Sequence, residues 1–305
     1  MAILPNKHRF PDFLVIGAHK CGTTALYRAL REHPEIHMSR VKEPRYFALE
    51  GNPPSYQPPR DGYGIADLTE YLALFDHAHP EQVAGEASPI YTSWHSPERT
   101  AQNILRRIPN VKLIVILRQP AIRAWSEYNY MRQQGAEPIR TFAEALAAED
   151  RPERADWFPD MFYFRTGLYA TILSHYFHIF SREQLHVILY DDYERDAAAT
   201  LKAVFEFLGV SEDFSPDTTI RHNKTWHVRS DRLERLTKRL EKPTGKVLYL
   251  PDFQRRWTLR QLKRFNRSPP PALSEAMYRE LTERYREDIL QLQDLIHRDL
   301  TLWLS

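Results

Sequence analysis

The sequence predicts an α/β fold, in which a mostly parallel β-sheet carries helices on both faces. Three observations favour this fold class. A strand, a glycine loop and a helix follow one another over residues 13–30, and an apolar strand at 111–117 is again followed by a helix. A helix, a strand and a helix then alternate over residues 167–208. Because such units recur along the chain, we expect a single domain over residues 1–305.

Length and composition limit the possible classes of protein. The 305 residues suffice for one large domain with a sizeable core. The 42 Lys and Arg against 40 Asp and Glu leave a net charge of +2, which gives no global signal for nucleic acid. Cys21 is the single cysteine, so an intramolecular disulfide is excluded, and no Cys/His cluster has zinc spacing. The N-terminal tail, residues 1–11, lacks the apolar segment of a signal peptide, and no apolar run could span a membrane. We expect a soluble, cytoplasmic protein.

The first unit of the chain combines a strand, a glycine loop and a helix. Residues 13–16 predict a short buried strand that ends at Gly17, and helical spacing begins after Gly22. Such a unit forms an anion site, because inward N–H groups and the helix dipole favour phosphate or sulfate. Thr23 or Thr24 would cap the helix and offer a hydroxyl donor.

The glycine spacing is that of a P-loop, but the lysine lies elsewhere. A Walker A loop places its lysine directly after the last glycine, followed by the hydroxyl that holds Mg²⁺. Here Thr23 and Thr24 follow Gly22, and Lys20 lies inside the loop beside Cys21. This order disfavours ordinary ATP or GTP hydrolysis. The run Lys-Cys-Gly-Thr-Thr resembles the 5′-phosphosulfate loop of sulfotransferases, which use 3′-phosphoadenosine 5′-phosphosulfate (PAPS). The resemblance implies a P-loop-type sheet and PAPS binding by all five of these residues.

A second motif, Lys-Glu-Pro-Arg-Tyr-Phe, occupies residues 42–47. Pro44 biases Glu43 towards an extended conformation, which would place a carboxylate on stiff backbone. A Lys-Glu-Pro-x-x-Phe segment at this position resembles the carbohydrate branch of the sulfotransferase family. The resemblance implies that Glu43 is the catalytic base and that Lys20 is the second catalytic residue. Burial and a neighbouring cation, Lys42 or Arg45, would tune the pKa of this base.

The next segments are predicted to shape the rim of the site. Residues 51–64 are rich in proline and glycine and predict a loop, of the kind that often forms a binding lid. A short helix is predicted over 68–75 and a strand over 83–91. The latter resembles the Gly-Glu-x-Ser/Thr-Pro-x-Tyr segment of the family. Ala87 stands where some heparan-type members carry lysine, which weakens the transfer of that substrate class.

The central strand and the helix after it carry the next candidates. A helix is predicted over 97–108, and the strand at 111–117 ends at Arg118. Ser126 follows eight residues later, on a helix that begins near Ala121. Such residues can converge above the carboxyl edge of the sheet, where a guanidinium recognises phosphate in a bidentate manner. The pair resembles the 3′-phosphate motif of the family, which implies that Arg118 and Ser126 distinguish PAPS from ATP.

The remaining body of the sheet is predicted from apolar periodicity. A helix is expected over 142–149, a strand over 185–190 and a helix over 197–208. Asp191 and Asp192 directly follow the strand. Two carboxylates without further ligand spacing favour a solvated strand end over a metal site, and no metal is expected.

The C-terminal third contains two basic segments. Residues 221–230 form a polar loop, and the resemblance implies that a basic loop here closes over the nucleotide. Its candidate contacts are Asn223, Lys224 and Arg229. From Gln254 to Arg267 there are six basic residues and no acid, which fits a solvated helix face or a patch for an anionic acceptor or lipid surface.

The last segment, residues 268–305, is predicted to pack on the core. Residues 273–304 predict a helix with an apolar stripe, broken near His297. Trp303 would anchor its end.

The resemblance implies transfer of the sulfuryl group from PAPS to a hydroxyl or amine of a carbohydrate, glycolipid or small-molecule acceptor. A P-loop nucleotide kinase is the enzyme alternative, and it should show a lysine directly after Gly22. A non-catalytic nucleotide-binding protein is the other alternative, against which Glu43 argues. If Glu43 is not the base, His19 and His37 are the next candidates. The sequence leaves the acceptor and the oligomeric state open.

Overall fold

The fold is built on a five-stranded parallel sheet in the order β2-β3-β1-β4-β5. The computed structural model describes residues 9–51, 64–154, 158–216, 227–241, 252–269 and 271–305. The strands are β1 (Phe13–Gly17), β2 (Ile36–Met38), β3 (Val83–Ala87), β4 (Lys112–Leu117) and β5 (Leu185–Leu189). β1 pairs with β3 on one side and β4 on the other, so that Val15 lies opposite Ala87 and Ile114. The predicted parallel α/β sheet is confirmed.

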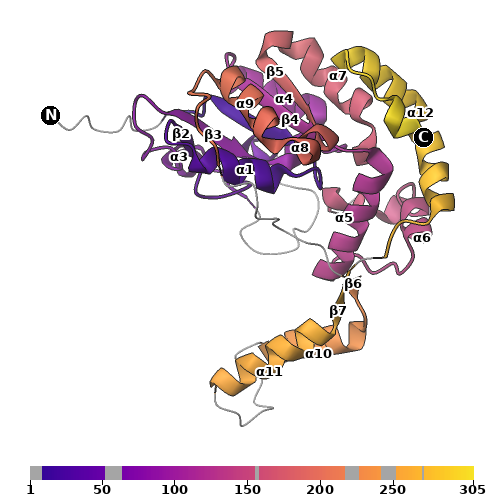
Figure 1. Ribbon diagram of the computed structural model, residues 1–305. Coiled ribbons are helices and arrows are strands. Elements are labelled where there is room, and N and C mark those ends of the chain that lie inside the picture. Colours follow the sequence, from indigo (N-terminus) through magenta and orange to yellow (C-terminus); the bar gives the residue numbers. More distant parts are fainter. Residues whose placement is uncertain (1–8, 52–63, 155–157, 217–226, 242–251, 270) are drawn as a thin grey trace.

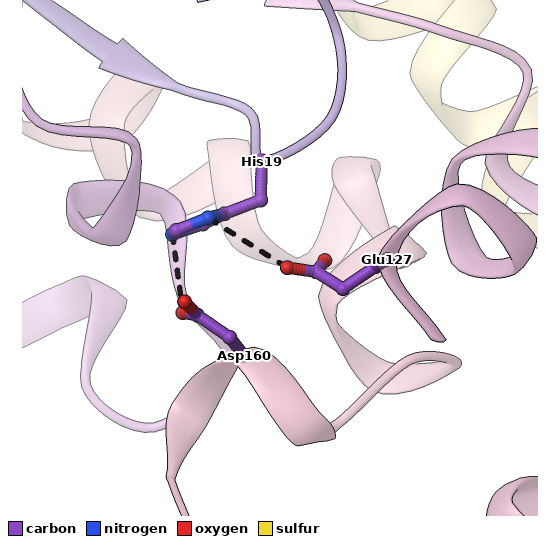
Figure 2. Close-up of side chains that lie close together, drawn as sticks. All are labelled: His19, Glu127 and Asp160. Carbon is purple, nitrogen blue, oxygen red and sulfur yellow. Dashed lines mark ion pairs between the residues drawn. The ribbon is translucent and has the colours of Figure 1, made fainter. Parts of the chain in front are cut away.

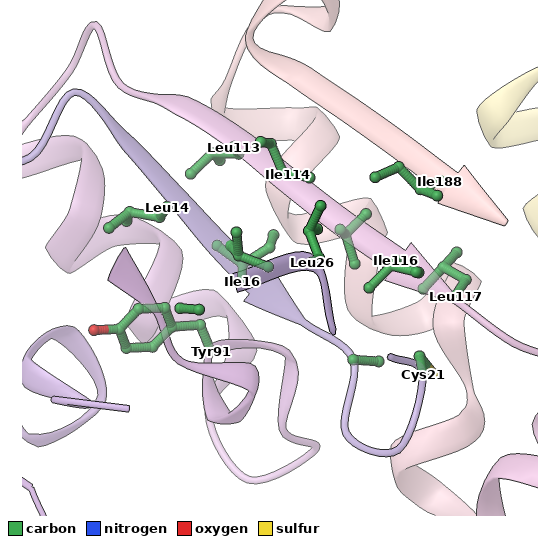
Figure 3. Packing of buried hydrophobic residues seen from close by; sticks show 14 of the residues in the cluster. Leu14, Ile16, Cys21, Leu26, Tyr91, Leu113, Ile114, Ile116, Leu117 and Ile188 are labelled. Carbon is green, nitrogen blue, oxygen red and sulfur yellow. The ribbon is translucent and has the colours of Figure 1, made fainter. Parts of the chain in front are cut away.

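The middle of the sheet is the most buried part of the body. The side chains of residues 13–16 in β1 are fully buried, and those of residues 113–117 in β4 are buried almost completely. Figure 3 shows this layer, with Leu14 and Ile16 beside the apolar side chains of β4. Helices exclude water from both faces, so every position of these strands can be apolar and the usual alternation disappears.

Helices cover both faces of the sheet (Figure 1). α1 (Thr23–Glu32) lies on one face, whereas α4 (Pro97–Arg107) and α7 (Tyr169–Ile179) pack together on the other. α12 (Glu275–Ile296) packs against α7 and α5 (Pro120–Gln134). The other helices of the body are α2 (Tyr46–Leu49), α3 (Leu68–Ala73), α6 (Phe142–Ala147), α8 (Tyr190–Arg195) and α9 (Ala197–Leu208). Among the described residues, no helix is long and apolar enough to cross a bilayer.

β1 and β4 are neighbours whose connections leave in opposite directions. From β1 the chain crosses to β2 at one edge of the sheet, and from β4 it crosses to β5 at the other edge. Open α/β sheets bind ligands outside the carboxyl ends of the strands at such a point. The loop of residues 18–22 follows β1 and Arg118 follows β4, so the topology brings both to this point.

The C-terminal segment is anchored as the sequence predicts. The apolar stripe of α12 is buried; its members are Tyr285, Ile289, Leu292 and Ile296. The helix ends at His297, whose φ of 53° lies in the left-handed region. Trp303 is buried, and its indole Nε1 donates a hydrogen bond of 2.7 Å to Asp191.

This anchor corrects the prediction for the end of β5. The strand ends at Leu189, and Tyr190 begins α8, so Asp191 and Asp192 lie in a helix rather than at a solvated strand end. Asp192 forms ion pairs of 2.5 Å with Arg195 and Arg298. Both acids therefore hold structure together, and the C-terminal segment supplies partners for each.

A separate unit, here called the arm, projects from the body below α5 in Figure 1. It consists of β6 (His227–Val228), α10 (Asp231–Glu241), α11 (Asp252–Phe265) and β7 (Arg267–Ser268). β6 and β7 pair in antiparallel fashion, β6 contacts α5, and the two helices pack on each other. The helix between Gln254 and Arg267 is thus observed, ending at Phe265. The single domain over residues 1–305 stays a prediction.

Candidate active site

The loop after β1 has the shape of an anion site. Gly22 is the N-cap of α1 with φ of 100°, a conformation that favours glycine. The prediction that Thr23 or Thr24 caps the helix was wrong, because they are its first two residues. Glycine has no side chain that could occupy the N-terminus of α1, which leaves room there for a bound anion. Gly17 is equally constrained, since a Cβ there would lie 2.0 Å from Thr92 Oγ1.

Lys20 lies at the centre of this loop. Its φ of 64° is left-handed, and its Nζ lies 4.1 Å from the centre of the Tyr130 ring. Burial lowers the pKa of Lys20, and its ammonium also interacts with the charges of Arg118 and Glu43. The structure therefore brings together three residues that the sequence predicts from separate motifs.

Arg118 lies at the carboxyl end of β4, partly exposed, as predicted. Its guanidinium carbon lies 4.7 Å from the centre of the Tyr190 ring. The same ring lies 3.1 Å from the position of a Cβ built on Gly22, so Tyr190 connects Arg118 to the loop. Sequence reasoning missed Tyr190, because an aromatic residue after an apolar run reads as the end of the strand. Ser126 lies in α5 and is partly exposed.

Cys21 has a structural environment. The side chain is fully buried, and its Sγ lies 3.4 Å from the carbonyl oxygen of His19 and 3.5 Å from the Tyr169 hydroxyl. Burial raises the pKa of the Cys21 thiol, which is therefore neutral and unsuited to act as a nucleophile. Figure 3 shows Cys21 in the loop after β1, among the buried apolar side chains, and its contact with a nucleotide stays a prediction.

Glu43 is held by two cations. Lys42 Nζ and an Arg45 guanidinium nitrogen each lie 2.5 Å from one of its carboxylate oxygens. Burial would raise the pKa of Glu43, but the charges of Lys42 and Arg45 outweigh it and lower the pKa to about 2. The prediction of an extended backbone was wrong: φ of Glu43 is 65°, and its N–H donates to Ala87 O at 3.1 Å. The β3 connection therefore overrides the bias from Pro44.

A buried network supports this segment. Glu86 accepts hydrogen bonds from Ser88 Oγ at 2.8 Å and from Tyr91 Oη at 2.5 Å. Ser88 Oγ in turn accepts the N–H of Arg45 at 3.0 Å. Burial raises the pKa of Glu86 to about 7, against the two hydrogen bonds, which lower it. The strand predicted over 83–91 ends at Ala87, and a 3₁₀ turn at Pro89–Thr92 brings Tyr91 back to Glu86.

A cluster of three side chains lies under the loop, with the imidazole of His19 between Glu127 and Asp160 (Figure 2). His19 Nδ1 lies 3.7 Å from Glu127 Oε1, and Nε2 lies 3.3 Å from Asp160 Oδ1. Within the described part of the chain, those two carboxylate oxygens and Nε2 make no hydrogen bond. Burial lowers the pKa of His19 to about 3 and raises that of Asp160 far above its usual range. A neutral imidazole beside a protonated Asp160 fits both directions.

Sequence reasoning missed two members of this cluster. Glu127 lies on α5 and Asp160 in the 3₁₀ turn Pro159–Met161, each distant in sequence from His19. Glu127 also forms a buried ion pair with Arg123, which compensates its charge. Spatially, the three residues could hold a metal ion, so the expected absence of a metal stays a prediction.

The remaining candidates lie elsewhere or outside the described residues. Asn223 and Lys224, like most of the lid predicted over 51–64, fall outside them. Arg229 is exposed at the end of β6, with its guanidinium carbon 5.9 Å from the Phe265 ring centre. His37, an alternative base, has its Nε2 3.3 Å from Leu74 O.

Comparison with known families shows to which family the chain belongs. The sequence profile of the sulfotransferase domain matches residues 10–288. The chain belongs to the sulfotransferase domain family. A crystal structure of a sulfotransferase from Alicyclobacillus acidocaldarius superposes with a TM-score of 0.73 at 29% identity, covering 97% of this chain and 100% of that one. The sulfotransferase resemblance of the Lys20 loop is thereby confirmed at the level of the family.

Curated relatives of this sulfotransferase domain act on sugars, according to their names. Mouse carbohydrate sulfotransferase 15 is 29% identical over 248 residues, which cover 66% of this chain and 44% of that protein. Human heparan sulfate glucosamine 3-O-sulfotransferase 6 is 28% identical over 211 residues, which cover 68% of this chain and 54% of that protein. The chain thus spans about half the length of these relatives.

Proposed function

We propose that this sulfotransferase domain transfers the sulfuryl group of PAPS to a hydroxyl or amine of a carbohydrate or small-molecule acceptor. One observation carries the proposal. Among the described residues, four that are not glycine have positive φ, and three of them are Lys20, Glu43 and Arg45. Backbone strain of this kind concentrates at functional sites. The names of the relatives favour a sugar acceptor, although Ala87 gives no support to the heparan-type class.

The residues that follow the carboxyl ends of β1 and β4 would suit a nucleotide with a 5′-phosphosulfate and a 3′-phosphate. PAPS, when bound, supplies the activated sulfuryl group. The ammonium of Lys20 and the N-terminus of α1 would balance the charge of the 5′ anion, and the hydroxyls of Thr23 and Thr24 would donate hydrogen bonds to it. Arg118 and Ser126 would hold the 3′-phosphate.

Glu43 would accept the proton of the attacking hydroxyl. With a pKa of about 2 it stays ionised at neutral pH, but it is a weak base. The acceptor therefore loses its proton late, once the bond to sulfur has begun to form and its hydroxyl has become more acidic. Charge on the sulfuryl oxygens would be balanced by Lys20, Lys42 and Arg45, so we infer that no metal takes part. Equal transfer rates with a chelator and with Mg²⁺ would support this.

The two alternatives predict other behaviour. A P-loop nucleotide kinase needs Mg²⁺ and a lysine after Gly22, and the family match does not favour it. A non-catalytic nucleotide-binding protein would retain Lys20 and Arg118 but show no turnover. Incubation with ³⁵S-labelled PAPS and a fractionated acceptor panel separates it from the enzyme.

The decisive binding test compares 3′-phosphoadenosine 5′-phosphate with ADP by calorimetry. Each charge-assisted bond to the 3′-phosphate contributes roughly 1.5–3 kcal/mol, so about tenfold to hundredfold preference is expected. The variant Arg118→Ala should lose most of the preference, whereas Arg279→Ala, on the exposed side of α12, should keep it. Equal affinity of the unaltered protein for the two nucleotides would refute the assignment.

A further inference from the structure

The arm exposes large apolar side chains. Among the described residues its outer surface includes Leu236, Trp257 and Phe265, which are 49%, 63% and 70% exposed. Scattered exposed apolar residues are normal on a soluble protein. Here, however, three large ones lie on a single pair of short helices, and two of them, Trp257 and Phe265, are aromatic.

Basic residues share the same face of α11. At about 100° per residue, Trp257, Arg260, Arg264 and Phe265 fall on one side of the helix, and all four are exposed. The opposite side contains Leu259, which is only 7% exposed. An amphipathic face that combines aromatic residues with arginines is typical of helices that lie in the interface of a bilayer.

α10 repeats this arrangement. Arg232, Arg235 and Leu236 are exposed and lie on one helical face, whereas Thr237 is fully buried. The two helices pack on each other, so their inner surfaces form a seam and the basic, apolar faces stay outside it.

The base of the arm is closed by hydrogen bonds. The side chain of Asn266 accepts the N–H of Ser230 at 2.9 Å and donates to the carbonyl of Ser230 at 3.2 Å. The backbone carbonyl of Asn266 accepts the N–H of Arg229 at 2.9 Å. The residues just before α10 and just after α11 are thus joined to each other beside α5. The two helices therefore project from the body as one unit, away from the sheet (Figure 1).

We propose that the outer faces of α10 and α11 dock on an anionic lipid bilayer. Arg232, Arg235, Arg260 and Arg264 contact lipid phosphates, while Trp257 and Phe265 enter the headgroup region. Charge complementarity selects this partner. A second copy of the arm would place arginine against arginine across a two-fold axis. A soluble polyanion would satisfy the arginines but would leave Leu236 and Phe265 in water.

The test measures sedimentation of the full chain with phosphatidylcholine vesicles, with and without phosphatidylglycerol. Binding to the anionic vesicles should be at least about tenfold tighter and should weaken with salt. Arg260→Glu with Arg264→Glu should remove that preference, because each arginine near the surface contributes about fivefold. Trp257→Ser with Phe265→Ser should weaken binding to anionic vesicles at unchanged charge.

Two matched controls lie on other parts of the body. Arg279→Glu with Arg286→Glu on α12 changes the net charge by the same amount, and Leu302→Ser removes an apolar side chain that is 86% exposed. Both should bind vesicles like the unaltered protein. Melting curves of all variants, which should coincide, separate lost docking from lost folding.

Three results would overturn the proposal. The first is equal binding to neutral and anionic vesicles, or none to either. The second is binding to a sulfated polysaccharide without binding to vesicles. The third is a dimer in sedimentation velocity that Trp257→Ser with Phe265→Ser dissociates while vesicle binding is absent. This proposal does not depend on the reaction, since transfer to a soluble acceptor can be measured separately.

Discussion

Lys20 and Glu43 keep a left-handed backbone that costs an ordinary residue about 1–2 kcal/mol. The surrounding hydrogen bonds hold the second of these conformations in place. The N–H of Glu43 binds Ala87 O, and the N–H of its neighbour Arg45 binds Ser88 Oγ. The stability given up at these two positions fixes two charged side chains of the candidate site.

We expect Glu43→Gln to fold and to bind nucleotide, but to transfer sulfate at least about a hundredfold more slowly. The amide keeps the shape of the carboxylate and removes its basicity. Single-turnover transfer with labelled PAPS gives the rate, and a melting curve with and without nucleotide reports folding. Glu50→Gln, at a carboxylate that pairs with Arg106 and Arg107, is the matched control. Unchanged transfer in Glu43→Gln would move the base to another residue.

The stabilising contribution of Glu86 should fall as the pH rises from 5 to 8. The pKa of Glu86 is about 7 in the folded state and about 4.3 in an unfolded chain. Its neutral form is therefore favoured by folding, so the stabilisation is complete below the lower value and is lost as the pH passes 7. The expected loss is at most about 3 kcal/mol, and Glu149, also at about 7, acts in the same direction.

Urea unfolding of Glu86→Gln at both pH values checks this. The difference in unfolding free energy between the unaltered protein and the variant should change by up to about 3 kcal/mol between the two pH values, because Glu149 and the other titrating groups are present in both. Glu98→Gln, on an exposed side chain, should give a difference that does not change with pH. A pH dependence that is the same in Glu86→Gln as in the unaltered protein would contradict the assignment.

At this scale the sequence predicts residues that belong to short motifs. Lys20, Glu43 and Arg118 are found because the chemistry requires them at fixed spacing from a glycine, a proline or a strand end. Glu127 and Asp160 have no such signal. They reach His19 only through the packing of α5 and of the turn at Pro159–Met161, which tertiary structure alone determines.

α7 begins without a cap of its own. Leu168 precedes it and has no polar side chain, so Asp288 of α12 accepts the N–H groups of Ala170 and Thr171 at 3.0 and 3.1 Å. The carboxylate of Asp288 thus caps the first turn of α7 and holds α12 in place against it. The positive end of the α7 dipole also stabilises the negative charge of this carboxylate.

Asp288→Ala should therefore destabilise the protein by about 1–2 kcal/mol, the usual effect of losing a helix cap. Urea unfolding at neutral pH measures the difference. The adjacent Glu287→Ala, on the exposed side of α12, is expected to change stability by less than about 0.5 kcal/mol. Equal losses of stability in the two variants would show that the cap makes no specific contribution to the free energy of unfolding.

Most elements follow from apolar periodicity, whereas their ends do not. The predicted strands and helices of the sheet are present, because burial on both faces leaves a clear apolar run. The errors lie at boundaries and at short elements, since β2, with 3 residues, and α2, with 4, are not predicted. Tyr190 continues the apolar run yet begins α8, and β3 ends at Ala87, two residues before the 3₁₀ turn Pro89–Thr92 begins.

The body should fold without the helical pair of the arm. A variant in which a short Gly-Ser linker replaces residues 231–265 should melt within about 2 °C of the unaltered protein, because β6 and β7 still meet. Its affinity for 3′-phosphoadenosine 5′-phosphate should be unchanged, and it should no longer bind anionic vesicles. Leu292→Ala in the body is the positive control, with an expected loss of about 2–5 kcal/mol. A large fall in melting temperature of the linker variant would mean that the arm is part of the core.

For the whole molecule, the sequence predicts the sheet better than it predicts the arm. Repeated strand–helix units imply parallel strands, whereas the order of the strands comes from the structure alone. The arm is different. A basic helix near residues 254–267 is predicted, but its pairing with α10 is a contact between two helices of similar composition. The sequence of neither helix indicates that it packs on the other.

The position of the arm has a kinetic consequence. A body attached to a bilayer at one fixed point meets lipid-linked molecules by diffusion in a plane, at a local concentration that tethering raises to the millimolar range. Under those conditions even an acceptor that makes few contacts with the protein would be bound. Selectivity for the acceptor would then come mainly from the membrane on which the protein lies, and less from contacts near Glu43.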